Sequence, residues 1–470
     1  MSEIENQTAP AVRDNSWATH VRGTLVLGVP LIGAQLATSA IGVTDTVMMG
    51  WLGVEKLAGG VLATQMHFVV WLFGAGFAFA IIPLAASAHG SDDVRGVRRS
   101  VRMGIWAVTF YFFLSLIPLW FAKDIMLLLG QEEVVAIIVE QYLRIAMWST
   151  LPLLLFFCMR SLLTVFEFGK IILWASVSTA VLNAVFNYAF MFGNFGAPEM
   201  GVRGAAVGTL LTQIVVFSGG LIYMLRNAEI APYEIFVRIW QPDWSALAEI
   251  LRIGWPISFG ILAEISLFIG ASIMMGWIGT VPLAAHGIAL QLATITFMIP
   301  LALSNVATVR VGKALGRKDW LGLERAGISV LVISISFAVF GAIVFFAMPE
   351  TLVQLFLDES MPDTSLVIAY AIPLIFVAAV FQLVDSAQVV AVGVLRGMKD
   401  ARTPMFIAIF CYWIVGMPVA YIFAFTLGYG GVGLWFGLAL ALFLAAILLN
   451  GRFMLRRKYG LVPIDAGSNI

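Results

Sequence analysis

Three acidic residues lie inside long apolar stretches of the sequence: Asp45, Glu264 and Asp385. Asp385 precedes Arg396 by eleven residues, so on a helix it lies about 16 Å from that basic end, roughly half the thickness of a bilayer core. A carboxylate at such a depth costs about 2.5–3.5 kcal/mol on insertion scales. Because a chain usually keeps such a group for an ion, a proton or a substrate, these acids are the first candidates for chemistry.

Glu264 and Asp385 both belong to the second half of the chain and have comparable predicted depths, since Glu264 follows Arg252 by twelve residues. Two carboxylates can bind Na⁺ with neutral oxygens, or share one proton because like charges at short range oppose double ionisation. The neutral oxygens could come from Gln291, Gln382 and Gln388. The alternative is structural, with each acid paired to an arginine such as Arg160 or Arg396.

Asp45 has two amide side chains as candidate partners. Asn183 and Asn187 are spaced i, i+4, so they share one face of a helix. One acid and two amides suit a second cation or proton site. For the asparagine pair alone, the alternative is helix–helix hydrogen bonding, worth about 0.6 kcal/mol per bond in a membrane.

Other residue types suggest a substrate cleft rather than an enzyme. Fourteen Trp, 35 Phe and 20 Met could supply a pliable wall for amphipathic organic cations. Phe381, Gln291, Gln382, Gln388 and His286 are candidate cleft residues, although packing is the stronger interpretation for the histidine. The four histidines and two cysteines form no metal-binding pattern, and no nucleotide-binding Walker A motif occurs, so we expect no cofactor and no direct use of ATP.

The composition requires a membrane. The chain has 470 residues, is 61% hydrophobic and 11% charged, and has a mean hydropathy of +0.97. A soluble core cannot use so much apolar surface. The first twenty residues lack the basic region of a cleaved signal peptide, so we expect the first apolar stretch to remain as an anchor.

Twelve apolar stretches are long enough to span a bilayer, and only helices satisfy the backbone of such spans. They cover residues 24–50, 57–86, 99–122, 133–160, 170–193, 201–225, 247–276, 283–312, 324–348, 363–394, 405–427 and 430–452. Prolines begin spans 1 and 7 and interrupt spans 4 and 10, where they could act as hinges or as static kinks; they are Pro30, Pro256, Pro152 and Pro373.

Charge is distributed unequally between the two sides. Basic residues follow spans 2, 6, 8, 10 and 12: Arg95, Arg98, Arg99, Arg102, Arg226, Arg238, Arg252, Arg310, Lys313, Arg317, Lys318, Arg325, Arg396, Lys399, Arg402, Arg452, Arg456, Arg457 and Lys458. The opposite turns hold mostly acids: Glu132, Glu133, Glu199, Glu350, Asp358, Glu359 and Asp363. The positive-inside rule therefore predicts that both termini are cytoplasmic.

The second half of the chain repeats the first at one constant offset. GVPLIGAQLA at Gly28 returns as GWPISFGILA at Gly254, and at the same offset MMGWLG at Met48 returns as MMGWIG at Met274. We therefore expect two parallel six-helix halves with the site in the cleft between them. The predicted organisation is a tail (1–22), an N-lobe (23–225), a linker at the cytoplasmic surface (226–246), a C-lobe (247–455) and a second tail (456–470).

The sequence resembles a known family, the multidrug and toxic compound extrusion (MATE) antiporters, in their NorM-like branch. The resemblance is carried by VTDTVMMGWLG at Val43, by Glu264, by FQLVDSAQVVAVGVLRGMKDARTP at Phe381 and by GVRGAAVGT at Gly201, and it covers about residues 20–458. It implies an all-α fold of twelve helices in a V-shaped pair of lobes, related by a pseudo-two-fold axis normal to the membrane.

The resemblance also implies a function. It implies export of cationic amphipathic drugs and dyes, driven by entry of Na⁺ or H⁺ at the positions of Glu264 and Asp385, with an N-lobe site at Asp45, Asn183 and Asn187. Phe381 departs from those relatives that carry Tyr there, which removes one oxygen ligand and leaves Na⁺ and H⁺ both open. The expected setting is a bacterial inner membrane, with lipids and drugs as partners, no nucleic acid, and a monomeric state.

Rival functions are weaker. A flippase for lipids or lipid-linked saccharides of the same superfold should have a basic cleft, whereas the midplane charges here are acidic. An aspartyl protease using Asp45 and Asp385 would need a dyad, yet these acids lie in different halves and at different depths. A channel without substrate is a further alternative.

Overall fold

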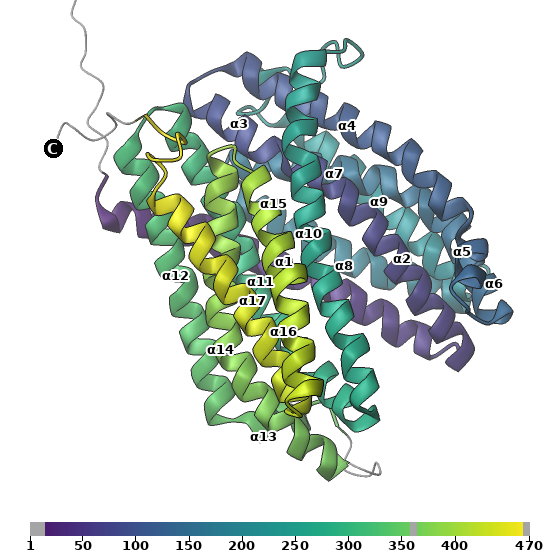
Figure 1. The fold of residues 1–470 in the computed structure, drawn as a ribbon. Helices are drawn as coiled ribbons and strands as arrows, with labels where there is room; N and C mark the ends of the chain where they lie inside the picture. The colour runs from purple at the N-terminus through teal and green to yellow at the C-terminus, as the bar shows by residue number, and fades with distance from the viewer. Residues whose placement is uncertain (1–14, 358–363, 464–470) are drawn as a thin grey trace, which may run out of the picture.

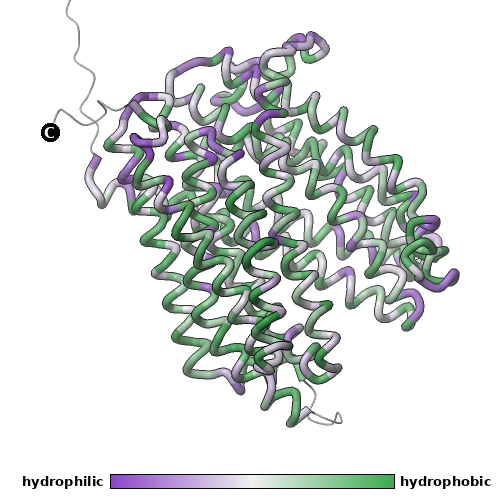
Figure 2. Tube along the Cα trace, in the orientation of Figure 1, coloured by the Kyte–Doolittle hydropathy of each residue, from purple (hydrophilic) through white to green (hydrophobic). Residues whose placement is uncertain are grey.

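The structure, a computed structural model, describes residues 15–357 and 364–463. Within these residues all regular structure is helical, and twelve helices are long and apolar enough to cross a membrane. Figure 1 shows two bundles that join at one end and diverge toward the other, in a V shape. In Figure 2 hydrophobic residues cover the length of the helices, while hydrophilic residues gather toward the ends. The predicted twelve-helix, two-lobe fold is confirmed.

Six spans make the N-lobe: α1 (Trp17–Gly50), α2 (Val54–Phe79) with α3 (Ile81–Gly90), α4 (Val94–Trp120) followed by short α5 (Ala122–Leu128), α6 (Glu133–Ala146) with α7 (Thr150–Val165), α8 (Gly169–Phe192) and α9 (Val202–Arg226). Six more make the C-lobe: α10 (Trp244–Ile278), α11 (Thr280–Gly316), α12 (Trp320–Ala347) followed by short α13 (Pro349–Gln354), α14 (Thr364–Gly397), an irregular eleventh span and α17 (Gly430–Met454). The eleventh span consists of α15 (Arg402–Ile409), the π-helix η4 (Phe410–Gly416), α16 (Met417–Tyr421) and the π-helix η5 (Ile422–Thr426). The predicted outer acids Asp358, Glu359 and Asp363 lie outside the described residues.

The first helix starts earlier than the apolar pattern predicts. It begins at Trp17 rather than near residue 24, because Ser16 caps it by accepting a hydrogen bond from the Thr19 amide at 3.3 Å. Asn15 then anchors this end by donating its side-chain amide to Asp319 at the start of α12, at 3.3 Å. The predicted tail 1–22 therefore includes the first turns of α1, and they are docked on the C-lobe.

Proline affects the helices unequally. α2 ends at Phe79, four residues before Pro83, and a 3₁₀ turn over residues 147–149 precedes Pro152, so the predicted interruption of span 4 is confirmed. In both places the missing proline N–H leaves the carbonyl four residues earlier without its helical partner. At Pro373 the helix is not broken, because α14 continues through this residue as one helix, and a kink there stays a prediction. α1 and α10 likewise remain single helices through their prolines.

The repeat is visible in the backbone. Asp93 caps α4 by accepting from the Gly96 amide at 2.9 Å, and its counterpart in the second half, Asp319, caps α12 by accepting from the Gly322 amide at 2.8 Å. The residues just before these caps, Asp92 and Lys318, share a left-handed φ of 55° and 57°. The two halves therefore fold the same turn from the same sequence pattern.

The lobes meet at the basic end through reciprocal contacts of α3 and α11. A β-carbon on Gly90 would collide with the Lys313 carbonyl, and one on Gly316 would collide with the Ser87 carbonyl. The repeat relates the two contacts to each other, because the offset that takes Gly90 to Gly316 also takes Ser87 to Lys313. Such self-complementary contacts are the signature of two-fold symmetry, so the pseudo-two-fold axis passes between α3 and α11.

The helices that begin each lobe cross between the lobes. α1 packs on α8 of its own lobe and also on α11 and α12, while α10 packs on α15 and α11 and also on α2 and α4. The carboxylate-bearing parts of α1 and α10 therefore belong to helices that are held by both halves of the molecule. A change in the lobe arrangement must act on these two helices.

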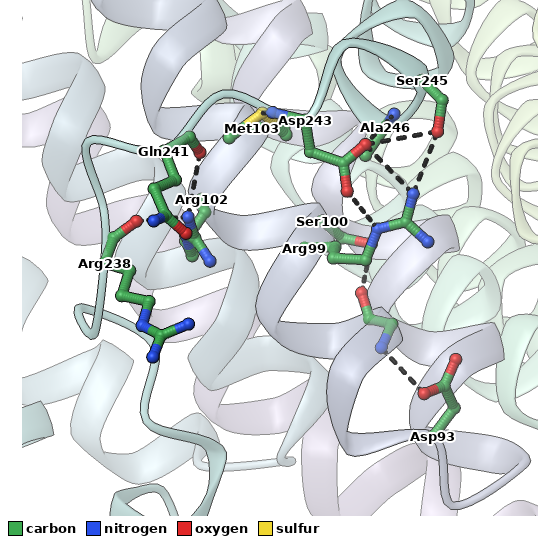
Figure 3. Close-up of polar contacts among 11 residues, drawn as sticks. Asp93, Arg99, Ser100, Arg102, Met103, Arg238, Gln241, Asp243, Ser245 and Ala246 are labelled. Carbon is green, nitrogen blue, oxygen red and sulfur yellow. Dashed lines mark hydrogen bonds and ion pairs between the residues drawn. The ribbon is translucent and has the colours of Figure 1, made fainter.

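The linker between the lobes is fastened to α4, as Figure 3 shows. Arg99 pairs with Asp243, the N-cap of α10, through Nε and Oδ2 at 2.5 Å, and Arg102 donates to the carbonyls of Arg238 and Gln241. The hydrogen bond from Arg99 lowers the pKa of Asp243 to about 2. Basic residues predicted to set topology thus also position the start of α10.

Candidate cation sites in the two lobes

The C-lobe site is built by α10 and α14, which bring Glu264 and Asp385 close enough for their charges to interact directly. α14 packs among α11, α12 and α17, so Asp385 is buried in the interior of the lobe with 4% of its surface exposed. Glu264 Oε1 and Asp385 Oδ1 are both buried atoms without a hydrogen-bond partner among the described residues. A buried carboxylate oxygen without a donor is costly, and a small cation bound between the two would satisfy both.

Arg396, in the last turn of α14, is the basic neighbour of this pair. It acts on Glu264 electrostatically, and among the described residues the two form no direct ion pair. The sequence left open that each acid is paired to an arginine. Glu264 has such a basic neighbour in Arg396, whereas the charged neighbour of Asp385 is another acid. With both acids ionised, the two carboxylates outnumber the single guanidinium, and the cluster carries one net negative charge.

Tyr412 is a member of this cluster that the sequence did not suggest. It lies in the π-helix η4, is buried with 1% of its surface exposed, and its hydroxyl has no hydrogen-bond partner among the described residues. Its ring carries that hydroxyl into the electrostatic range of both Glu264 and Asp385. π-Helical turns are frequent at functional sites, but the sequence around Tyr412 contains no pattern that predicts a π-helix.

The N-lobe site joins α1 and α8. Asn187 Nδ2 donates to Asp45 Oδ1 at 2.6 Å and lies 3.3 Å from Asn183 Oδ1, so the structure brings together the three residues that the sequence grouped. Asn187 Oδ1 is a further buried oxygen without a donor among the described residues. Tyr142 on α6 is a residue that the sequence missed, and it interacts electrostatically with Asp45. One carboxylate and several oxygens in a dry setting suit a single monovalent cation or a proton.

The two sites are not symmetry mates. At the offset that aligns the repeats, Asp45 corresponds to Ala271 and Glu264 corresponds to Thr38. The two repeats therefore share a backbone fold, but their buried acids occupy non-equivalent positions of the repeat. Each lobe therefore has a candidate site of its own rather than one half of a shared one.

The glutamines predicted as donors or cleft residues have different surroundings. Gln382 is buried beside Gly341 of α12, and neither of its amide atoms has a hydrogen-bond partner among the described residues. Gln388 is buried with a partnerless Oε1, whereas Gln291 is exposed on α11. Gln382 and Gln388 lie within one turn of Asp385 on α14, so their oxygens remain candidates for its coordination.

Phe381 and His286 belong to a packed aromatic cluster of the C-lobe in this structure. The Phe381 ring lies 5.5 Å from Trp435 and 6.1 Å from Phe268. His286 accepts from Trp435 Nε1 at 3.1 Å through Nδ1, and its Nε2 lies 3.0 Å from the Ser272 hydroxyl. Both ring nitrogens are thus satisfied by neighbours, which favours packing for His286; a cleft role for either residue stays a prediction.

Comparison with known proteins identifies the family of this chain, and the match falls on both of its halves. A family model described as MatE matches residues 30–189 and again residues 256–422, so the two matched segments begin at the equivalent prolines Pro30 and Pro256. The chain belongs to the MatE family. Two relatives, each called "Probable multidrug resistance protein NorM", come from Rhizobium meliloti and Agrobacterium fabrum. The first is 49% identical and spans 95% of this chain and 96% of its own; the second is 48% identical and spans 97% and 98%.

Solved structures share the fold. A crystal structure of a MATE transporter in the bent conformation superposes with a TM-score of 0.84 at 19% identity, covering 95% of this chain and 99% of that one. A MOP superfamily transporter from Pyrococcus furiosus, described as having a reverse polarity of its binding pocket that suggests a different function, superposes with a TM-score of 0.78 at 20% identity, covering 93% of this chain and 96% of that one. As a MatE member the chain is a multidrug efflux transporter of the NorM type and not an enzyme.

Proposed function

We propose that this MatE protein exports cationic amphipathic drugs and dyes in exchange for Na⁺ or H⁺ by alternating access. The observation that carries the proposal is the pair of partnerless buried carboxylate oxygens on Glu264 and Asp385, which face each other's charge inside the C-lobe. The relatives named as multidrug resistance proteins support the substrate class. In this scheme the driving ion is a substrate of transport rather than a resident cofactor.

Competition for one negative charge provides the coupling. With both acids ionised, the C-lobe cluster of Glu264, Asp385 and Arg396 carries one net negative charge, so a single monovalent cation or one proton neutralises it. A cationic drug that uses the same charge loses affinity when that cation binds, and the antagonism is necessarily reciprocal. A tenfold mutual antagonism corresponds to about 1.4 kcal/mol. Asp45 would bind a second cation in the N-lobe.

The lobe arrangement suggests which side is open. The lobes are joined at the basic end by the reciprocal contacts of α3 and α11, and Figure 1 shows them diverging toward the other end. The positive-inside rule assigns the basic end to the cytoplasm, which puts both termini there and makes this an outward-facing state. We propose a monomer in a bacterial inner membrane.

A flippase for lipids or lipid-linked saccharides is the second candidate. Fold likeness alone does not exclude it, because the transporter with reverse pocket polarity shares the fold. The sign of the charge favours export of cations: both interior clusters are centred on acids, whereas a pyrophosphate carrier needs bases there.

The test is ethidium efflux from proteoliposomes under an imposed Na⁺ gradient and then an imposed pH gradient. Wild-type protein is compared with Glu264→Gln and Asp385→Asn, which keep the shape of each side chain and remove its charge. The matched control is Glu350→Gln, which changes an exposed acid at the end of the molecule opposite the basic end. The proposal expects efflux under at least one gradient, retained by the control and lost by both site variants. Normal efflux in both site variants would remove the acids from the mechanism, and absence of wild-type efflux under either gradient would favour the flippase.

A further inference from the structure

A cavity of about 370 Å³ lies between the lobes at the basic end, away from both acidic sites. The start of α1, the turn between α7 and α8, the last turns of α11 and the start of α12 form its walls. Its charged or hydrogen-bonding wall residues include His20, Glu167, Arg310, Lys313, Arg317 and Asp319. Because Glu167 comes from the N-lobe and the α11 residues come from the C-lobe, the cavity is complete only while the lobes are joined.

The cavity has more positive than negative charge. Arg310, Lys313 and Arg317 follow one another on α11 at spacings of three and four residues, so they share one helix face. Glu167 Oε1 pairs with Lys313 Nζ at 2.6 Å. Asp319 is engaged by the Gly322 amide at 2.8 Å and by the Asn15 side chain. Three bases and two acids leave a surplus of one positive charge among the described residues.

Arg310 contributes to this surplus. Its Nη2 lies 2.9 Å from His20 Nδ1, and because a guanidinium can only donate, the imidazole nitrogen accepts and the ring is neutral. Among the described residues Arg310 has no carboxylate within ion-pair distance, since the nearby Glu167 is bonded to Lys313. A partly buried guanidinium beside an ammonium, both facing a cavity, is the arrangement that recognises phosphate.

The cavity lies at the level of the membrane surface. Trp17, half exposed at the start of α1, is stacked under the Arg325 guanidinium at 5.5 Å, and tryptophan at a helix end marks the head-group level. Basic pockets between transmembrane helices on the cytoplasmic side bind anionic lipid head groups.

We propose that this cavity binds a phosphate group, with Arg310 and Lys313 as its ligands, supplied by the head group of an anionic phospholipid. The phosphate lies on α11 in a cavity whose wall both lobes form, between the start of α1 and the turn that carries Glu167. Because the site exists only in the joined state, its occupation stabilises that state and slows its opening, as linkage requires. The binding itself does not rest on the proposed export function; only its effect on the transport cycle does.

A second cavity supplies a matched control. It has about 330 Å³ and is lined by Glu249, Arg252, Ile253, Lys399, Asp400, Ala401 and Arg402, all of the C-lobe. Lys399 has a φ of 62° at the turn after α14, as Glu167 has a φ of 64° at the turn after α7. Arg402 is exposed there, and Asp400 pairs with Arg452 at 2.6 Å. This cavity has basic residues but does not bridge the lobes.

The test measures the thermal unfolding midpoint of the purified full chain in detergent with increasing short-chain phosphatidylglycerol, phosphatidylcholine or inorganic phosphate. We expect phosphatidylglycerol to raise the midpoint of the wild type and of Arg402→Gln, with half-saturation about tenfold weaker in Arg310→Gln and Lys313→Gln. Phosphatidylcholine should give no saturable shift. Arg310→Lys, which keeps the charge, should recover part of the affinity and covers the case in which a neutral variant folds poorly.

Each other outcome has one meaning. If inorganic phosphate reproduces the shift and Arg310→Gln abolishes it, the phosphate site stands and its ligand is a soluble phosphate compound. Equal half-saturation in wild type, Arg310→Gln and Lys313→Gln would overturn the site. A loss in Arg402→Gln as large as in Arg310→Gln would reduce the effect to general surface charge and overturn it as well. Failure of dye efflux would leave these binding results unchanged.

Discussion

Asn187 donates a hydrogen bond of 2.6 Å to Asp45 although 142 residues separate them in the chain. The contact fixes one carboxylate oxygen of Asp45 and leaves the Asn187 carbonyl oxygen buried without a donor among the described residues. An arrangement with one negative charge and a spare oxygen is poised for a cation or a proton. The N-lobe site can therefore be tested separately from the C-lobe site.

Asp45→Asn should abolish this charge while keeping the shape. We expect ion-driven dye efflux to fall at least tenfold, because the site at Asn183 and Asn187 then has no carboxylate to bind the driving cation, while the variant elutes and melts like the wild type. Efflux from proteoliposomes and the unfolding midpoint measure the two effects. Efflux at the wild-type rate in a folded Asp45→Asn protein would exclude the N-lobe site from coupling.

Tyr412→Phe removes only the hydroxyl that approaches Glu264 and Asp385. Because this hydroxyl has no other partner among the described residues, its removal should cost little stability and should weaken binding of the driving cation about tenfold, the effect of one lost oxygen ligand of roughly 1.4 kcal/mol. The cation concentration at half-maximal efflux measures this. Tyr421→Phe, an exposed tyrosine of the same span, is the matched control. Equal half-maximal concentrations in wild type and Tyr412→Phe would remove Tyr412 from the site.

Gly316→Val should weaken the joint between the lobes. A side chain there collides with the Ser87 carbonyl, and overpacking of this kind costs about 1–3 kcal/mol. Gly90→Val should have the same effect because its contact with Lys313 is the reciprocal one. Gly287→Val, on the same α11 helix with open space around its β-carbon position, should melt like the wild type. Equal midpoints for Gly316→Val and Gly287→Val would contradict the reciprocal joint.

Substitution of Asp243 tests how the Arg99 ion pair and the N-cap stabilise the start of α10. Its folded-state pKa of about 2 lies below the ordinary value of 3.8, so the stabilisation by Arg99 is complete above that ordinary value and is lost only as the pH falls toward 2. Asp243→Ala should cost about 1 kcal/mol, the typical value of an N-cap, with no change in the loss between pH 5 and pH 8. Asp93→Ala, which removes a cap without this arginine pair, is the control. A loss that varied with pH across this range would contradict the assignment.

Much of this architecture could be predicted from the sequence, because membranes restrict the choice. Apolar length defines the spans, the repeated GVPLIGAQLA and GWPISFGILA segments define the two halves, and the i, i+4 spacing of Asn183 and Asn187 places both amides on one face. These features depend on local pattern. The grouping of Asp45 with the asparagines came from the family resemblance as well as from residue type.

Other features depend on packing that no local pattern records. The π-helix that presents Tyr412 has no signature in its residues, and Pro373 lies inside an unbroken α14 that packs among α11, α12 and α17. α1 begins at Trp17, after the Ser16 cap, and Asn15 next to this cap donates to Asp319 of the other lobe, a contact across 304 residues. The cavity at the basic end is equally a product of assembly, since Arg310 and Lys313 come from the second repeat and Glu167 comes from the first.

Competition between the driving cation and the exported cation for the charge of Glu264 and Asp385 is the centre of the proposed mechanism. Its most direct test is equilibrium binding of ethidium to the purified protein, followed by fluorescence as Na⁺ or proton concentration is raised at constant ionic strength. We predict that at least one of these cations weakens ethidium binding in the wild type and that Glu264→Gln and Asp385→Asn remove this dependence. Ethidium affinity that is indifferent to both cations in the wild type, or a dependence that survives in both variants, would contradict the mechanism.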